Sequence, residues 1–142
     1  MAENTDNQVP NEAPNQAPKI DWVTERSACT LPKVFYRLRL EVEADVKTRN
    51  SLRPELAPYE FSITDDVKDF SVILQNGDVR KTVKFSLTDY AILVYDPNGN
   101  QLLEVTSRLS DAGKCELFFN QEVRESWQVR RIALEGLMFG NK

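Results

Sequence analysis

The side chains best suited to acid–base chemistry in this chain are carboxylates, because its 142 residues include no histidine. Histidine is the commonest general base near neutral pH and the commonest metal ligand in proteins. Ser–His, Cys–His and His-ligated zinc sites are therefore excluded within a single chain. Enzymes that use carboxylates, lysine, tyrosine or a cofactor stay open. We expect a protein that is not an enzyme and that holds no cofactor and no metal.

Three aspartates lie close together in the sequence, at Asp65, Asp66 and Asp69. Such a cluster suits a hard cation, or a proton shared between like charges. Aspartate is also one of the residues that β-turns prefer, and an exposed turn is the interpretation we favour. Asp65 and Asp66, together with Arg130, are the best candidates for the less favoured alternative, an enzyme that works without histidine.

Arg130 is unusual because it falls inside the apolar stripe of a predicted C-terminal helix. Val123, Trp127 and Leu134 surround it at helical spacing. An arginine in that setting must extend to solvent, stack on an aromatic ring or meet a carboxylate. We take Trp127 and Arg130 as candidate pocket residues, between the sheet and this helix.

Cys29 and Cys115 are the only cysteines, and their spacing matches no metal-binding or redox motif. Isolated cysteines most often behave as small buried apolar residues, which is the interpretation we favour. A disulfide between them is the less favoured alternative.

The elements that must position these side chains follow from hydrophobic periodicity. From Tyr59 to Phe119, apolar and polar residues alternate in short runs separated by turn signals, which predicts strands. Helical periodicity precedes this region, from an N-cap at Thr30 to a stop near Asn50, and follows it from an N-cap at Asn120. We predict an α+β domain with an N-terminal helix, an antiparallel meander of about six strands and a C-terminal helix, the helices packing mainly on one sheet face.

Composition sets the domain organisation and excludes two classes of partner. Residues 1–19 are rich in Asn, Gln, Pro and Ala and predict a disordered arm, whereas residues 20–142 predict a single domain. A net charge of −4 argues against nucleic acid as a ligand. No apolar run is long enough to cross a membrane, and no secretory signal is evident, so we expect a cytoplasmic location.

The chain carries more apolar residues than a two-layer monomer needs. Tyr36 and Leu40 form a second apolar row on the first helix, and Ile132 and Phe139 lie off the main stripe of the last one. We take these four as candidate interface residues. Large exposed apolar patches usually mark binding. Three explanations stay open: a homodimer that buries the patch, a curved sheet that leaves a ligand cavity, and coverage by Trp22, Val23 and the extended segment Leu52–Pro58.

In size, acidity and order of elements the chain resembles the small acidic secretion chaperones, which form dimers around an unfolded client but place a helix between their strands. Its C-terminal helix resembles that of the lipid- or ligand-binding helix-grip domains, which begin with a strand. Neither resemblance carries over a site residue. The sequence predicts a non-enzymatic protein–protein interaction or chaperone-like module that acts as a homodimer or with a protein partner. The alternative is a small-molecule or lipid-binding domain with a pocket between the sheet and the C-terminal helix.

Overall fold

The computed structural model describes residues 19–140, and the predicted arm lies outside this range except for Lys19. The helices are α1 (Trp22–Ala28), α2 (Leu31–Ser51) and α3 (Ser126–Phe139). The strands are β1 (Tyr59–Asp65), β2 (Asp69–Asn76), β3 (Val79–Leu87), β4 (Ile92–Tyr95), β5 (Gln101–Leu109), β6 (Cys115–Phe119) and β7 (Glu122–Arg124).

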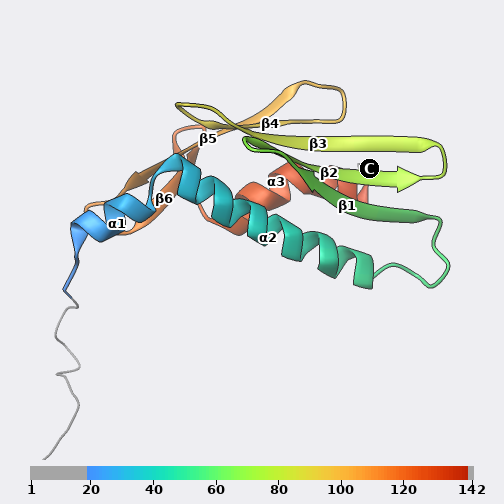
Figure 1. The fold of residues 1–142 in the computed structure, drawn as a ribbon, viewed down its shortest axis with the longest axis horizontal. Helices are drawn as coiled ribbons and strands as arrows, with labels where there is room; N and C mark the ends of the chain where they lie inside the picture. Colours follow the sequence, from blue (N-terminus) through green and yellow to red (C-terminus); the bar gives the residue numbers. More distant parts are fainter. Residues whose placement is uncertain (1–18, 141–142) are drawn as a thin grey trace, which may run out of the picture.

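The sheet is a seven-stranded antiparallel meander in which the strands follow one another in chain order. Figure 1 shows α2 and α3 on the same side of this sheet. The predicted α+β class and the helix–sheet–helix order are therefore confirmed. Short turns join neighbouring strands, so the sheet order follows directly from the order of the elements in the sequence.

The seventh strand is β7, and it corrects the predicted start of the last helix. Asn120 is not an N-cap, because Asn120 and Gln121 have φ values of 57° and 64° and form the two-residue turn between β6 and β7. Two left-handed residues in succession are typical of a hairpin turn. Glu125 is the actual N-cap, and it exchanges hydrogen bonds with Gln128 in a capping box.

The core lies between the sheet and the two long helices. α2 contributes its buried stripe to it, and Phe35, Phe70 and Phe85 form a continuous aromatic stack from helix to sheet. The buried residues of α2 are Val34, Phe35, Leu38, Val42 and Val46. This is the stripe that helical spacing predicts, so the first long helix is positioned by burial of its apolar face.

A short helix precedes α2. The Asp21 carboxylate caps α1 by accepting hydrogen bonds from the hydroxyl and the backbone N–H of Thr24, which lower the pKa of this carboxyl below its ordinary value. At the other end of α1 lies Cys29, next to the start of α2.

Cys29 and Cys115 form a disulfide, so the prediction of two separate buried cysteines was wrong. Their Cα atoms lie 5.4 Å apart although 86 positions separate them in the sequence. The meander brings the start of β6 under the junction between α1 and α2, which no local pattern reveals. The bond attaches this junction to the last part of the sheet.

None of the helices in the described part of the chain is long and apolar enough to cross a membrane.

Candidate functional site

α3 borders two clefts that are lined in part by exposed apolar side chains. The first, which we call the sheet cleft, lies between the C-terminal half of α3 and the ends of β1, β2 and β3, and has a volume of about 790 Å³. The second, the helix groove, lies between α2 and α3 and has a volume of about 450 Å³. Phe139 borders both clefts.

Both walls of the sheet cleft carry apolar side chains, and polar residues, among them Lys81 and Asp96, also line it. On the sheet side, the apolar side chains are the helix-facing ones of Phe61, Leu74 and Val83. On the helix side, Ile132 is 37% exposed and Phe139 is 64% exposed at the rim. Large apolar side chains kept at the edge of an apolar hollow are typical of a surface that binds another apolar group.

Gly136 lies on the cleft side of α3 and is partly exposed. Glycine inside a helix costs about 1 kcal/mol relative to alanine. At this position α3 therefore lines the sheet cleft without a side chain.

Arg49 closes one end of the sheet cleft. Its guanidinium carbon lies 5.5, 5.2 and 4.8 Å from the ring centres of Tyr59, Phe61 and Phe139. Its Nε donates to the Met138 carbonyl oxygen at 2.9 Å. No carboxylate among residues 19–140 lies within ion-pair distance of it. The site therefore holds a cation whose charge is met by aromatic rings and a carbonyl, and which can still receive an anion.

Arg130 and Trp127, the sequence-predicted pocket residues, lie in the helix groove and not in the sheet cleft. Arg130 Nη1 binds both carboxylate oxygens of Asp45 at 2.8 and 2.7 Å, and its Nε donates to Ser126 Oγ at 3.3 Å. The sequence predicted that this arginine extends to solvent, stacks on an aromatic ring or meets a carboxylate, and the structure shows the carboxylate. Ser126 Oγ in turn donates to Glu41, so polar contacts join α2 and α3 across the groove.

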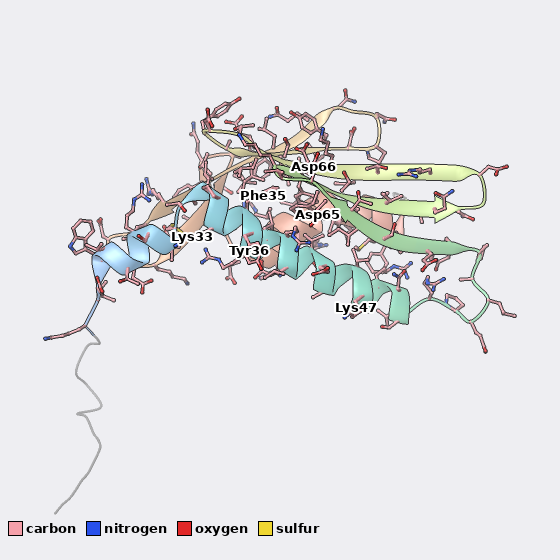
Figure 2. The ribbon with its side chains drawn as sticks, in the orientation of Figure 1. Lys33, Phe35, Tyr36, Lys47, Asp65 and Asp66 are labelled. Carbon is pink, nitrogen blue, oxygen red and sulfur yellow. A yellow bond between two sulfur atoms is a disulfide. The ribbon has the colours of Figure 1, made fainter. Side chains whose placement is uncertain are left out.

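The four sequence-predicted interface residues occupy different parts of the surface. Tyr36 and Leu40 are exposed on α2 and line neither cleft. Figure 2 shows Tyr36 on the side of α2 away from the sheet, opposite to Phe35. Ile132 and Phe139 are the two members of the set that border the sheet cleft.

The candidates for catalysis do not come together. Asp65 forms an ion pair with Arg39 at 3.0 Å, and the Asp66 carboxylate accepts the backbone N–H of Val67 at 2.8 Å within the β1–β2 turn. Arg130 is instead paired with Asp45 in the helix groove, between α2 and α3. Within residues 19–140 no cluster of three or more carboxylate or cysteine side chains is arranged to hold a metal ion.

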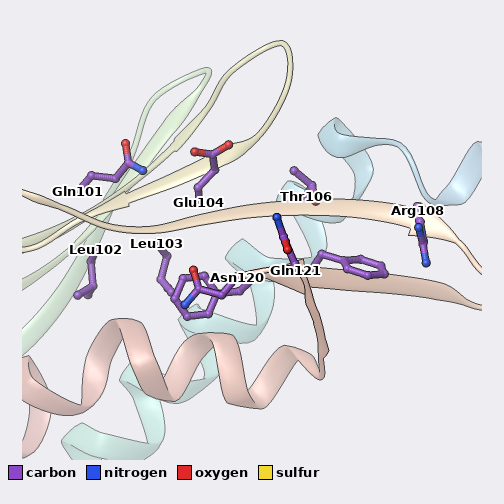
Figure 3. A pocket seen from close by; sticks show the side chains of 10 residues that line it. Gln101, Leu102, Leu103, Glu104, Thr106, Arg108, Asn120 and Gln121 are labelled. Atoms are coloured by element: carbon purple, nitrogen blue, oxygen red, sulfur yellow. The ribbon is translucent and has the colours of Figure 1, made fainter.

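A third hollow, with a volume of about 730 Å³, follows β5 from Gln101 to Arg108 (Figure 3). We call it the edge notch. It is bordered by Gln101, Glu104 and Arg108 of β5, and by the Asn120–Gln121 turn. Leu102 borders both the edge notch and the sheet cleft, so the two hollows are neighbours. Sequence reasoning missed this feature, because hydrophobic alternation does not reveal where along β5 its neighbour β6 stops pairing.

Comparison of the chain with family models, with curated proteins and with solved structures finds no match.

Proposed function

We propose that this protein is a non-enzymatic binding module that takes a segment of a different protein in the sheet cleft, against α3. The observation that carries the proposal is the position of Ile132 and Phe139. Both are large apolar side chains that stay exposed beside a hollow of about 790 Å³ with apolar side chains on both walls. Burying such side chains contributes roughly 25 cal/mol per Å² of apolar area, so a partner gains most by covering this rim.

The continuity of the hollows favours a protein segment over a small ligand. The sheet cleft meets the edge notch at Leu102 and the helix groove at Phe139. A ligand of small-molecule size fills one pocket of 300–1,000 Å³, whereas a polypeptide segment can follow connected hollows over a longer distance. The occupant is therefore expected to be long and apolar on one side.

A second candidate function is the binding of a small amphipathic anion, such as a fatty acid. The position of Arg49 favours it, because this guanidinium borders the sheet cleft and has no carboxylate within ion-pair distance among the described residues. A carboxylate head group would accept hydrogen bonds from Arg49 while the chain occupied the cleft.

Selection from a phage-displayed library of random linear peptides tests the leading function. We expect selected peptides to bind the full chain, and Ile132→Glu to weaken binding by about tenfold, because an apolar contact at the rim of the cleft becomes a charge that the peptide buries. Tyr36→Glu is the matched control, since Tyr36 is 58% exposed and lies outside the clefts. Equal loss in both variants would place the site elsewhere. Saturable oleate binding that Arg49→Met weakens, with no peptide selected, would support the second function instead.

Light scattering coupled to gel filtration tests the remaining occupant, a second copy of this chain. A dimer at tens of micromolar that Ile132→Glu converts to a monomer would show that the sheet cleft serves self-association.

The disulfide between Cys29 and Cys115 bears on where the module works. Disulfides persist in oxidising compartments and are rare in reducing ones. This favours an oxidising compartment over the cytoplasmic location that sequence analysis leads us to expect.

A further inference from the structure

We propose that the partner segment is extended and joins the sheet as an added strand, on the free edge of β5 at Gln101–Val105. This inference rests on the proposed function and specifies how the partner binds. It also names the chemistry that the partner must carry.

Neither half of β5 is paired with a strand along both of its edges. Its first half, Gln101–Val105, pairs with β4 except at Leu102, where the register shifts, whereas its second half, Thr106–Leu109, pairs with β6. β6 stops following β5 because the Asn120–Gln121 turn pairs Phe119 with Glu122 of β7. Alternate N–H and C=O groups of Gln101–Val105 therefore point towards an edge without a strand. The edge notch of about 730 Å³ lies there (Figure 3).

At the outer edge of β1, side chains block the addition of another strand. The side-chain amide of Asn50 binds the main chain of Phe61 twice, accepting its N–H at 3.0 Å and donating to its C=O at 2.7 Å. Arg53 Nη1 donates to the carbonyl oxygen of Tyr59 at 2.6 Å. These side chains occupy the positions that an added strand would take, so β1 is blocked.

The edge of β3 beyond its pairing with β4 is protected in another way. Val79–Val83 has no β4 partner, but it carries the exposed side chains of Arg80 and Lys81. Charged residues, lysine above all, discourage strand addition. Gln101–Val105 lacks the side-chain cover that β1 has, and it carries no positive charge. Within residues 19–140, no side chain and no loop donates to or accepts from its main chain, and its one charged residue is Glu104.

The register of β5 defines the partner's side chains. Leu103 and Val105 are buried, at 1% and 0% exposure, and face the helices. Residues opposite each other on neighbouring strands share a face, so the partner needs apolar residues at these two positions. At the position between them, which faces away from the helices, the exposed Glu104 has no cation within ion-pair distance among the described residues. A lysine or arginine of the partner fits there.

Opposite charges already face each other once between β5 and its neighbour. Four residues further along β5, Arg108 lies directly opposite Glu116 of β6. An added strand with a basic residue opposite Glu104 would extend the same pattern of opposite charges along β5. Its apolar residues would lie near Leu102, where the edge notch meets the sheet cleft.

Two synthetic peptides test the inference on the full chain: an acetylated and amidated peptide of alternating valine and lysine, and one of alternating valine and glutamate. Amide hydrogen exchange, followed by NMR, is read at Gln101–Val105, with Val79–Val83 as internal reference. We expect the lysine peptide to slow exchange at least about tenfold at Gln101–Val105 and not at Val79–Val83, because strand pairing protects main-chain amides. We expect it to bind on the order of threefold more tightly than the glutamate peptide.

Glu104→Lys should reverse this preference, and the matched control Glu60→Lys should not, because Glu60 is an exposed residue of the blocked strand β1. Ile132→Glu separates the two levels of the proposal. Suppose that Ile132→Glu abolishes peptide binding, that the peptide leaves amide exchange at Gln101–Val105 unchanged in the original chain, and that Glu104→Lys does not alter the peptide preference. Strand addition is then overturned, and the proposed function stands. A further outcome is that, without peptide, amide exchange at Gln101–Val105 slows as the protein concentration rises. That result would assign this edge to a second copy of the chain and overturn the inference.

Discussion

Asp45 of α2 and Arg130 of α3 form an ion pair in which Arg130 Nη1 meets both carboxylate oxygens, at 2.8 and 2.7 Å. The two side chains are 35% and 17% exposed, so water screens the pair only in part. The pair lies in the helix groove and joins the two helices that cover the sheet. Its geometry makes it a structural contact, in which the arginine that looked like a candidate pocket residue is already engaged.

We expect Asp45→Ala to lower the free energy of unfolding by about 1–2 kcal/mol, because it leaves a partly buried guanidinium with Glu41, 3.9 Å from its Nε, as its remaining carboxylate partner. The double variant with Arg130→Met should recover part of this loss. Urea denaturation measures both. Glu135→Ala is the control, since the Arg131–Glu135 pair is exposed and should contribute less than about 0.5 kcal/mol. Equal losses at Asp45 and Glu135 would contradict this account.

The disulfide should contribute measurably to stability. We expect the double variant Cys29→Ser and Cys115→Ser to unfold with a free energy about 2–4 kcal/mol lower, because the bond closes a long loop in the unfolded chain. Thermal denaturation in the presence and absence of a thiol reductant checks this, and the reductant should leave the double variant unaffected. Titration of two free thiols in the native, unreduced protein would refute the bond itself.

Asn50 should protect the edge of β1. Replacing it by alanine removes both hydrogen bonds to Phe61, and we expect a loss of about 1–2 kcal/mol in unfolding free energy. Opening this edge should also increase association at high protein concentration, since an unpaired edge invites strand pairing. Thermal denaturation and static light scattering measure the two effects. Ser51→Ala, next to Asn50 but exposed, is the control; a variant Asn50→Ala with unchanged stability would exclude the edge role.

Gln121 is a position where substitution should stabilise the fold. Its φ of 64° lies in the left-handed region, which glycine adopts without the steric cost that a Cβ brings. We expect Gln121→Gly to raise the free energy of unfolding by about 0.5–1 kcal/mol, because asparagine–glycine is the preferred pair in such a turn. Gln101→Gly, within strand β5, should lower it. A fall in melting temperature for Gln121→Gly would show that the glutamine side chain does more than complete the turn.

Local patterns in the sequence determined the elements and their order. The alternation from Tyr59 to Phe119 predicted the strands, and the Asn76–Gly77 pair between β2 and β3 is typical of the hairpin turn that the structure shows there. The stripe from Val34 to Val46 predicted the buried face of α2. These features depend on neighbours within a few positions, so they can be inferred without coordinates. A meander sheet then follows, because each strand pairs with the next one along the chain.

Contacts between distant segments were decided by the tertiary structure. Asparagine suits a helix cap and a left-handed turn equally well, so Asn120 was placed correctly only when β7 was seen to pair with β6. The partners of Cys29 and Arg130 lie 86 and 85 positions away. The free edge of β5 depends on where β6 turns away from it. Periodicity carries no information about such offsets, since pairing over long separations is set by how the whole chain packs.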